Sequence, residues 1–181
     1  MTLITYARRP LARLDTPARL TDLADGEFEG YASLFGVPDG AGDVVAHGAF
    51  AATLRRRPPD KVRMLYQHSA LEPLGVWQTI HEDARGLYVR GRLVLDVVRA
   101  REVRSLIREG ALNGLSIGFR TVRATRDAKT GLRTLTEIEL WEISVVTFPL
   151  LADSKVTVVG GKSAPLANSI RKAALDLRHQ T

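Results

Sequence analysis

Residues 110–120 read Gly-Ala-Leu-Asn-Gly-Leu-Ser-Ile-Gly-Phe-Arg and place Ser116 between Gly114 and Gly118. The string G-x-S-x-G marks the serine nucleophile of α/β-hydrolases, in which a strand precedes the serine and a helix follows it. Here the order is reversed, because the residues before Gly110 have helical periodicity and those after Ser116 alternate as in a strand. The stretch therefore argues against an α/β-hydrolase. Either Ser116 is a nucleophile in another fold, or the match is accidental.

Outward from this stretch, the chain alternates between short strand patterns and turn signals. The expected strands are residues 27–35, 62–67, 74–80, 86–95, 115–125 and 132–148. Two helices are inserted among them, one over residues 48–57 and one that Asp96 caps and Gly110 ends. This pattern predicts an α+β, mainly β fold: an antiparallel, closed or nearly closed β-barrel with flanking helices.

The chain of 181 residues has the length of one domain with appended tails. We expect a basic N-terminal arm over residues 1–26, a folded domain over 27–159, and a C-terminal hinge and amphipathic helix over 160–181. The helix is indicated by an apolar stripe, whose members are Leu166, Ile170, Ala173 and Leu177. We interpret this helix as a docking element, with a disordered tail as the alternative.

Composition excludes several classes of protein. With no cysteine, the chain has no disulfides, thiolate metal sites or cysteine nucleophiles, and a cytosolic location is the simplest expectation. No apolar run has the length of a membrane span, and the N-terminus lacks the apolar core of a secretory signal. The net charge of +6 comes mainly from arginine. Because no aromatic residues interleave the basic runs, we favour a solvated surface over nucleic-acid binding.

A serine nucleophile needs a base, and the chain has four histidines: His47, His68, His81 and His179. His68 ends an expected strand and precedes a loop, where a rigid scaffold presents functional side chains. The other three lie at a helix start, beside a hairpin turn and on the terminal tail. His68 is the candidate base, and a structural role for it stays open.

The third member of a triad is a carboxylate that orients the imidazole. Glu142 lies in the most hydrophobic expected strand, where a carboxylate is costly unless it has a partner or faces water at an edge. Asp43 and Asp96 compete with it, although a loop accounts for Asp43 and capping for Asp96. No His, Asp and Glu cluster has metal-ligand spacing, and no glycine-rich phosphate loop precedes a helix, so we expect neither metal nor cofactor.

A succession of motifs over residues 30–148 closely resembles the HK97-type prohead maturation proteases of tailed phages, in the same order and with near-standard spacing. The motifs are GYASLFG (30–36), GDVV (42–45), GAF (48–50), YQHSALEPLGVW (66–77), RGLYVRGRL (85–93), GALNGLSIGFR (110–120) and LTEIELWEISVVTFP (135–149). Two departures are His47 before Gly-Ala-Phe, which we read as neutral, and Leu150-Leu151 after Pro149. The second leaves the position of the oxyanion hole open.

The resemblance implies a serine endopeptidase with a herpesvirus assemblin-like barrel and no cofactor. His68 would be the base, Ser116 the nucleophile and Glu142 the third member, with backbone N–H groups near Leu150 holding the oxyanion. Members of the family, including those of gene transfer agents, cut the scaffold segment of the major capsid protein, and often themselves, inside the prohead.

The expected setting is therefore an assembling prohead in the bacterial cytoplasm, with the capsid protein as partner and a homo-oligomer such as a dimer. Membrane partners are not expected. Two alternatives stay open: a catalytically silent structural component of the capsid, and a small esterase with the same triad.

Overall fold

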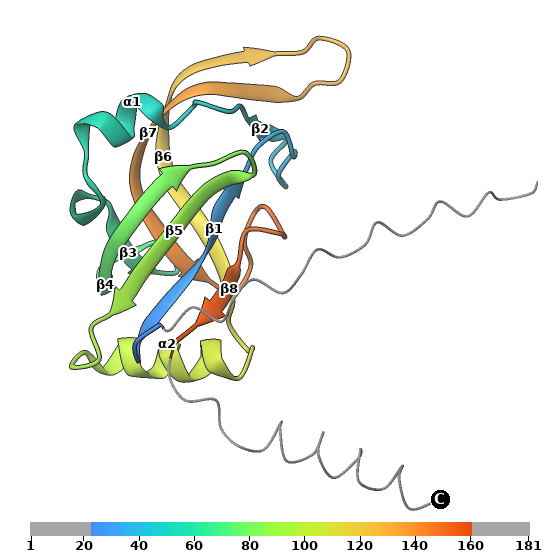
Figure 1. Cartoon of the computed structure of the whole chain (residues 1–181). Helices are drawn as coiled ribbons and strands as arrows, with labels where there is room; N and C mark the ends of the chain where they lie inside the picture. The colour runs from blue at the N-terminus through green and yellow to red at the C-terminus, as the bar shows by residue number, and fades with distance from the viewer. Residues whose placement is uncertain (1–22, 161–181) are drawn as a thin grey trace, which may run out of the picture.

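A computed structural model describes residues 23–160 of the chain, which form one strongly curved β-sheet with helices at its sides (Figure 1). Most of the expected N-terminal arm and the expected C-terminal helix lie outside the described residues, so the predictions for those segments stay predictions. None of the helices within residues 23–160 is long and apolar enough to cross a membrane.

Eight strands make up the sheet over the described residues. They are β1 Glu27–Leu34, β2 Asp43–Val45, β3 Arg63–Tyr66, β4 Ser69–Glu82, β5 Gly86–Leu93, β6 Gly114–Arg126, β7 Arg133–Val146 and β8 Val156–Val159. Their order is β2-β7-β3-β4-β5-β1-β8, and β6 pairs with β7. Two α-helices, α1 Ala51–Arg56 and α2 Val98–Arg108, and a 3₁₀ turn, η1 Pro59–Lys61, complete the described elements.

The mainly β class with flanking helices is confirmed, but two parts of the expected architecture are wrong. The sheet is mixed, because β2 and β3 both run parallel to β7. It is also an open half-barrel, since its edge strands β6 and β8 are not paired as a ladder; one isolated bridge joins Gly114, the first residue of β6, to Lys155, the residue before β8. β8 has four residues and β6 has thirteen, so β8 is too short to pair along the length of β6.

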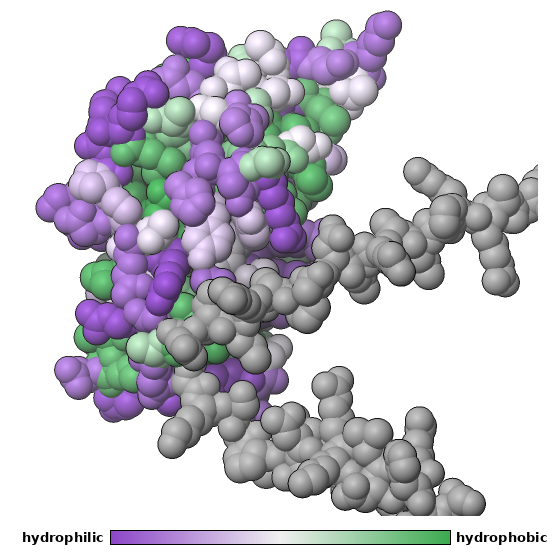
Figure 2. All heavy atoms as spheres, viewed as in Figure 1, coloured by the Kyte–Doolittle hydropathy of each residue, from purple (hydrophilic) through white to green (hydrophobic). Residues whose placement is uncertain are grey.

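The core fills the concave side of this sheet. Inward-facing side chains from six strands are almost fully buried: Phe28, Met64, Leu74, Leu87, Leu115 and Ile143. Helix α2 lies across one end of the half-barrel and buries Ala100, Val103 and Ile107 against it (Figure 1). On the outside, the face seen in Figure 2 is mostly hydrophilic, with apolar residues in smaller groups. Burial of this apolar surface is the main force that holds the curved sheet together.

The element boundaries agree with the sequence at some positions and differ at others. The β4–β5 hairpin forms where expected, and Gly110, at φ +74°, ends α2 in the left-handed region that favours glycine. Asp96 does not cap α2: the N-cap is Val97, which makes no side-chain hydrogen bond. Strands β2 and β8 were not expected, because segments of three and four residues carry too little alternation to stand out.

Candidate active site

A β-bulge in β7 determines which side of the sheet Glu142 faces. Gly118 pairs with Glu142 in the β6–β7 ladder, but the next residue, Phe119, pairs with Leu140, so Trp141 is the extra residue. A bulge of this kind re-aims the side chains that follow it. Just before the bulge, the even-numbered residues Ile138 and Leu140 are fully buried in the core.

After the bulge, the odd-numbered residues take the core positions, where Ile143 and Val145 are fully buried. Glu142 and Ser144 therefore point to the other face. Directly opposite residues of an antiparallel pair share a face, so Glu142 joins Gly118, and Ser144 joins Ser116. The bulge thus brings the carboxylate of Glu142 to the face that carries Ser116.

His68 lies in a tight turn with an unfavourable backbone conformation. Tyr66 and Ser69 pair at the ends of β3 and β4, which leaves Gln67 and His68 as a two-residue hairpin loop. Both loop residues have positive φ, 50° for Gln67 and 60° for His68. Asn-Gly is the usual sequence for such a turn, because other side chains are strained there. Gln67 and His68 stand where the turn alone would favour smaller residues.

The contacts of this turn with β7 hold it in place. β3 runs parallel to β7 with Tyr66 opposite Val145, so the turn lies beside the end of β7. The Gln67 backbone N–H donates to the Val145 carbonyl at 3.0 Å. Its side-chain amide also donates to Thr147 Oγ1 at 2.6 Å and accepts the Thr147 backbone N–H at 3.3 Å. These three hydrogen bonds offset the strain of the turn.

The side chains of Ser116, His68 and Glu142 form a continuous hydrogen-bonded line. His68 Nε2 lies 3.0 Å from Ser116 Oγ, and His68 Nδ1 lies 2.6 Å from Glu142 Oε1. The Ser116 residue is 7% exposed, whereas the side chain of His68 is 44% exposed. The structure therefore brings together the three residues singled out in the sequence. This is the geometry in which an imidazole takes a proton from a hydroxyl while a carboxylate orients it.

Ser144 is a part of this site that the sequence did not reveal. Its side chain is fully buried, and its Oγ donates to Glu142 Oε2 at 2.7 Å. The same oxygen accepts the backbone N–H of His68 at 3.0 Å. Ser144 thus fixes the carboxylate and the strained turn at the same time. Its place two residues after Glu142, on the same face of the strand, was the only available signal.

The other candidates from the sequence lie elsewhere. Asp43 is held by Arg133, whose Nε donates to Asp43 Oδ1 at 2.7 Å. The ring of His47 packs edge-on against Phe35, and His81 packs against Tyr88. His179 lies outside the described residues. Within residues 23–160, no group of three or more His, Asp and Glu side chains could hold a metal ion.

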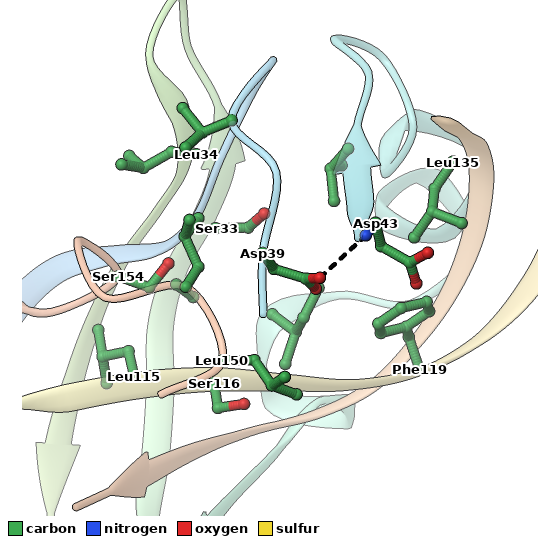
Figure 3. A pocket seen from close by; sticks show the side chains of 15 residues that line it. Ser33, Leu34, Asp39, Asp43, Leu115, Ser116, Phe119, Leu135, Leu150 and Ser154 are labelled. Atoms are coloured by element: carbon green, nitrogen blue, oxygen red, sulfur yellow. Dashed lines mark hydrogen bonds between the residues drawn. The ribbon is translucent and has the colours of Figure 1, made fainter. Parts of the chain in front are cut away.

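A pocket opens beside Ser116 (Figure 3). Its walls come from β1, from the loop before β2, from β6 and from the loop after β7, which contributes Leu150. Leu150 therefore lines the same pocket as Ser116. That backbone N–H groups near Leu150 hold the oxyanion stays a prediction. Two backbone bonds link the walls: Gly40 N–H donates to the Leu150 carbonyl, and Leu115 N–H donates to the Ser154 carbonyl, both at 2.9 Å.

Sequence comparisons relate this chain to known proteins. Residues 13–168 match the family model described as caudovirus prohead serine protease. The prohead protease of Enterobacteria phage HK97 is 36% identical over 152 residues, which cover 83% of this chain and 66% of that protein. The prohead protease of Escherichia phage T5 is 32% identical over 120 residues, which cover 64% of this chain and 55% of that protein. The matched region thus spans less than two thirds of either relative.

A solved phage protease structure shares the fold at low sequence identity. The structure of the bacteriophage T4 capsid assembly protease matches with a TM-score of 0.55 and 14% identity, over 66% of this chain and 80% of that chain. The crystal structure of KSHV protease with a hexapeptide phosphonate inhibitor gives a TM-score of 0.47 and 10% identity, over 72% of this chain and 63% of that chain. At 14% identity, the T4 match concerns the fold alone.

Proposed function

This chain belongs to the caudovirus prohead serine protease family, and from that premise we propose that it is a serine endopeptidase of capsid maturation. One observation carries the proposal: Ser116 Oγ, the His68 ring and the Glu142 carboxylate form a hydrogen-bonded line, with distances of 3.0 and 2.6 Å. Three separate segments must meet to form it, so a chance arrangement is a poor explanation. Ser144 holds Glu142 and the His68 turn in place, and the bulge at Trp141 turns Glu142 toward them.

In the proposed mechanism, Ser116 Oγ attacks the scissile carbonyl while His68 Nε2 takes the hydroxyl proton. His68 then returns this proton to the leaving amine, and water hydrolyses the acyl-enzyme by the same steps in reverse. Glu142 keeps the proton of the neutral imidazole on Nδ1, which leaves Nε2 free to act as the base, and stabilises the charged imidazolium. Backbone N–H groups near Leu150 stabilise the oxyanion.

The proposed substrate is the scaffold segment of the major capsid protein, with the protease itself as a second substrate. The segment would bind as an extended strand along an edge of the half-barrel, where main-chain groups are available for pairing. The protease would act inside the assembling prohead in the bacterial host, as a homo-oligomer. The competing role is a catalytically silent capsid component, and the presence of all three side chains in bonding geometry favours the enzyme.

The test is co-expression of the full chain with its capsid protein precursor, once with the wild type and once with Ser116→Ala. We expect the wild type to shorten the precursor and the variant to leave it at full length, as read by intact-mass spectrometry. Full-length precursor in both cases, with normal shells, would support the silent capsid component. Turnover of simple esters without cleavage of the precursor would indicate an esterase.

A further inference from the structure

Three arginines gather around one carboxylate where the end of α1 meets β7 and β6 (Figure 1). Glu139 forms an ion pair with Arg57 at 3.5 Å, and Arg120 donates to its other oxygen from Nε and Nη2, at 3.0 and 2.7 Å. Arg56 is exposed, and its guanidinium makes no hydrogen bond or ion pair within residues 23–160. This arginine cluster, formed by Arg56, Arg57 and Arg120, therefore carries more positive charge than Glu139 can balance.

A hollow of about 250 Å³ lies within this cluster, and its lining residues are Thr53, Arg56, Arg57 and Glu139. Two of these side chains have little left to offer a ligand. Thr53 Oγ1 donates to the Ile138 carbonyl at 2.7 Å, and each carboxylate oxygen of Glu139 is held by an arginine. The guanidinium of Arg56 is free to donate, so the hollow favours a ligand with negative charge and hydrogen-bond acceptors.

The arginine cluster lies on the face of β6 that carries the nucleophile. Ile117 and Phe119 pack against the core. Because side chains alternate along a strand, Ser116, Gly118 and Arg120 project from the opposite face. The rise of the strand from Ser116 to Arg120 is about 13 Å, which an extended peptide covers with about four residues. A peptide that is cut at Ser116 can therefore reach the cluster with a nearby segment.

The cluster suits an acidic peptide better than a nucleic acid. Nucleic acids are bound by cations that are spaced along a track of phosphates. Arg123, the next arginine of β6, is balanced by Glu137 at 3.4 Å, so the unbalanced charge is interrupted directly beside the cluster. The three arginines instead converge on one hollow, which is large enough for an acidic side chain.

We propose that the arginine cluster is a second contact site for the substrate, where Arg56 and Arg120 bind an aspartate or glutamate about three to five residues from the scissile bond. The inference rests on the proposed protease function and adds a feature of the substrate that the protease reads. Because the cluster lies away from the reacting atoms, it would bind the substrate and the transition state equally well. An acidic side chain at this position should therefore lower KM and leave kcat unchanged.

The experiment first exposes the full chain to a proteome-derived peptide library and reads the cleaved sequences. We expect aspartate or glutamate to be enriched at one position about three to five residues from the cut. Peptide pairs that differ only in glutamate or glutamine at that position should then give a kcat/KM ratio of about 3- to 10-fold in favour of glutamate. Arg56→Gln and Arg120→Gln should each lower this ratio toward one, and Arg56→Glu should favour lysine over glutamate at the same position.

Arg92→Gln is the matched control, because Arg92 is an exposed arginine of β5 whose guanidinium has no hydrogen bond or ion pair among the described residues. It should keep the wild-type ratio. A wild-type ratio near one, or a ratio that Arg56→Gln and Arg120→Gln both leave unchanged, would overturn the proposal. Cleavage of the capsid precursor would then leave the protease function standing. If wild type cuts neither peptides nor precursor, the proposed function fails and the contact site falls with it.

A role in nucleic-acid binding is the competing use of the arginine cluster. It is tested by the fluorescence anisotropy of a fluorescein-labelled single-stranded DNA with the full-length Ser116→Ala chain. We expect the addition of Arg56→Gln to leave any DNA binding unchanged. DNA binding that is lost with Arg56→Gln, together with an unchanged peptide ratio in Arg56→Gln, would assign the cluster to nucleic acid instead.

Discussion

Gly118 lies directly opposite Glu142 in the β6–β7 ladder, and a Cβ on Gly118 would overlap the carboxylate of Glu142. The second glycine of G-x-S-x-G therefore has a specific purpose in this fold. In α/β-hydrolases the motif forms a sharp turn around the serine. Here Ser116 and Gly118 lie in a regular strand, and the missing side chain leaves the space in which Glu142 reaches His68.

Gly118→Ala should therefore displace Glu142 from His68. We expect kcat/KM to fall about 10- to 100-fold, since the imidazole loses its orienting carboxylate, and the melting temperature to fall as well. Both can be measured with a peptide substrate and by calorimetry. In the double variant Gly118→Ala, Glu142→Ala the overlap is removed, so the melting temperature should recover while activity stays low. Unchanged activity in Gly118→Ala alone would show that Glu142 does not need this space.

Ser144→Ala removes one hydrogen bond to Glu142 and leaves the His68 backbone N–H without its partner. We expect kcat to fall about 10- to 100-fold, because Glu142 and the turn at His68 each lose a hydrogen bond that positions them. A lost buried hydrogen bond costs about 1–3 kcal/mol, which corresponds to a factor of this size. Thr53→Val is the matched control: Thr53 is also a buried hydroxyl, and it donates to the Ile138 carbonyl away from Ser116. The control should lower the free energy of unfolding and leave kcat unchanged. Equal kcat in both variants would contradict a positioning role for Ser144.

Replacing each carboxylate by its amide distinguishes the role of Glu142 in activity from the role of Asp43 in stability. Glu142→Gln keeps the shape of the side chain but favours the wrong imidazole tautomer, so we expect a loss of about 10²–10⁴-fold in kcat, smaller than for His68→Ala. Asp43→Asn weakens the ion pair with Arg133 and should cost about 1–3 kcal/mol of stability with little effect on kcat. If steady-state kinetics showed a large loss of kcat in Asp43→Asn and little loss in Glu142→Gln, Asp43 would be the carboxylate that orients His68.

The stability of the fold should depend on pH through Glu27. Hydrogen bonds from Gln78 and Arg90 lower the pKa of Glu27 from 4.5 to about 2. A lowered pKa in the folded state contributes stability that is complete above the unfolded value and is lost as the pH falls from about 4.5 to about 2. Glu27→Gln should be less stable than wild type near pH 7, and urea unfolding should show the difference shrinking toward pH 2. A stability difference between Glu27→Gln and wild type that is constant with pH would refute the assignment.

The local elements of this fold could be predicted from the sequence, but the closure of its sheet could not. Alternation and turn signals were sufficient for the β4–β5 hairpin and for the end of α2 at Gly110. They could not reveal that β3 runs parallel to β7, because the residues that pair, such as Leu65 and Ser144, lie far apart in the chain. Strand direction and sheet closure depend on such long-range pairings, and a single sequence does not display them.

The candidate site also has a part that could be predicted from the sequence and a part that could not. Motif resemblance was enough to choose Ser116, His68 and Glu142, whose chemistry needs those residue types. The supporting parts were missed: Gln67 and Ser144 lie within the quoted motifs, but one sequence does not show that the turn at Gln67 is strained or that Ser144 holds the carboxylate of Glu142. The alternation of β7 also breaks at Trp141, so pattern alone could not tell whether Glu142 faces the core or the nucleophile. The bulge decides this, and it appears only when β6 and β7 are paired.

The central claim is that Ser116 is a nucleophile activated by His68, and covalent labelling of the full chain tests it most directly. A fluorophosphonate probe should add to the wild type once, and peptide mapping should place the adduct on Ser116. His68→Ala should slow labelling strongly, Ser116→Ala should abolish it, and the exposed Ser105→Ala should match wild type. An adduct on another residue, or labelling of Ser116 at an equal rate without His68, would contradict the account.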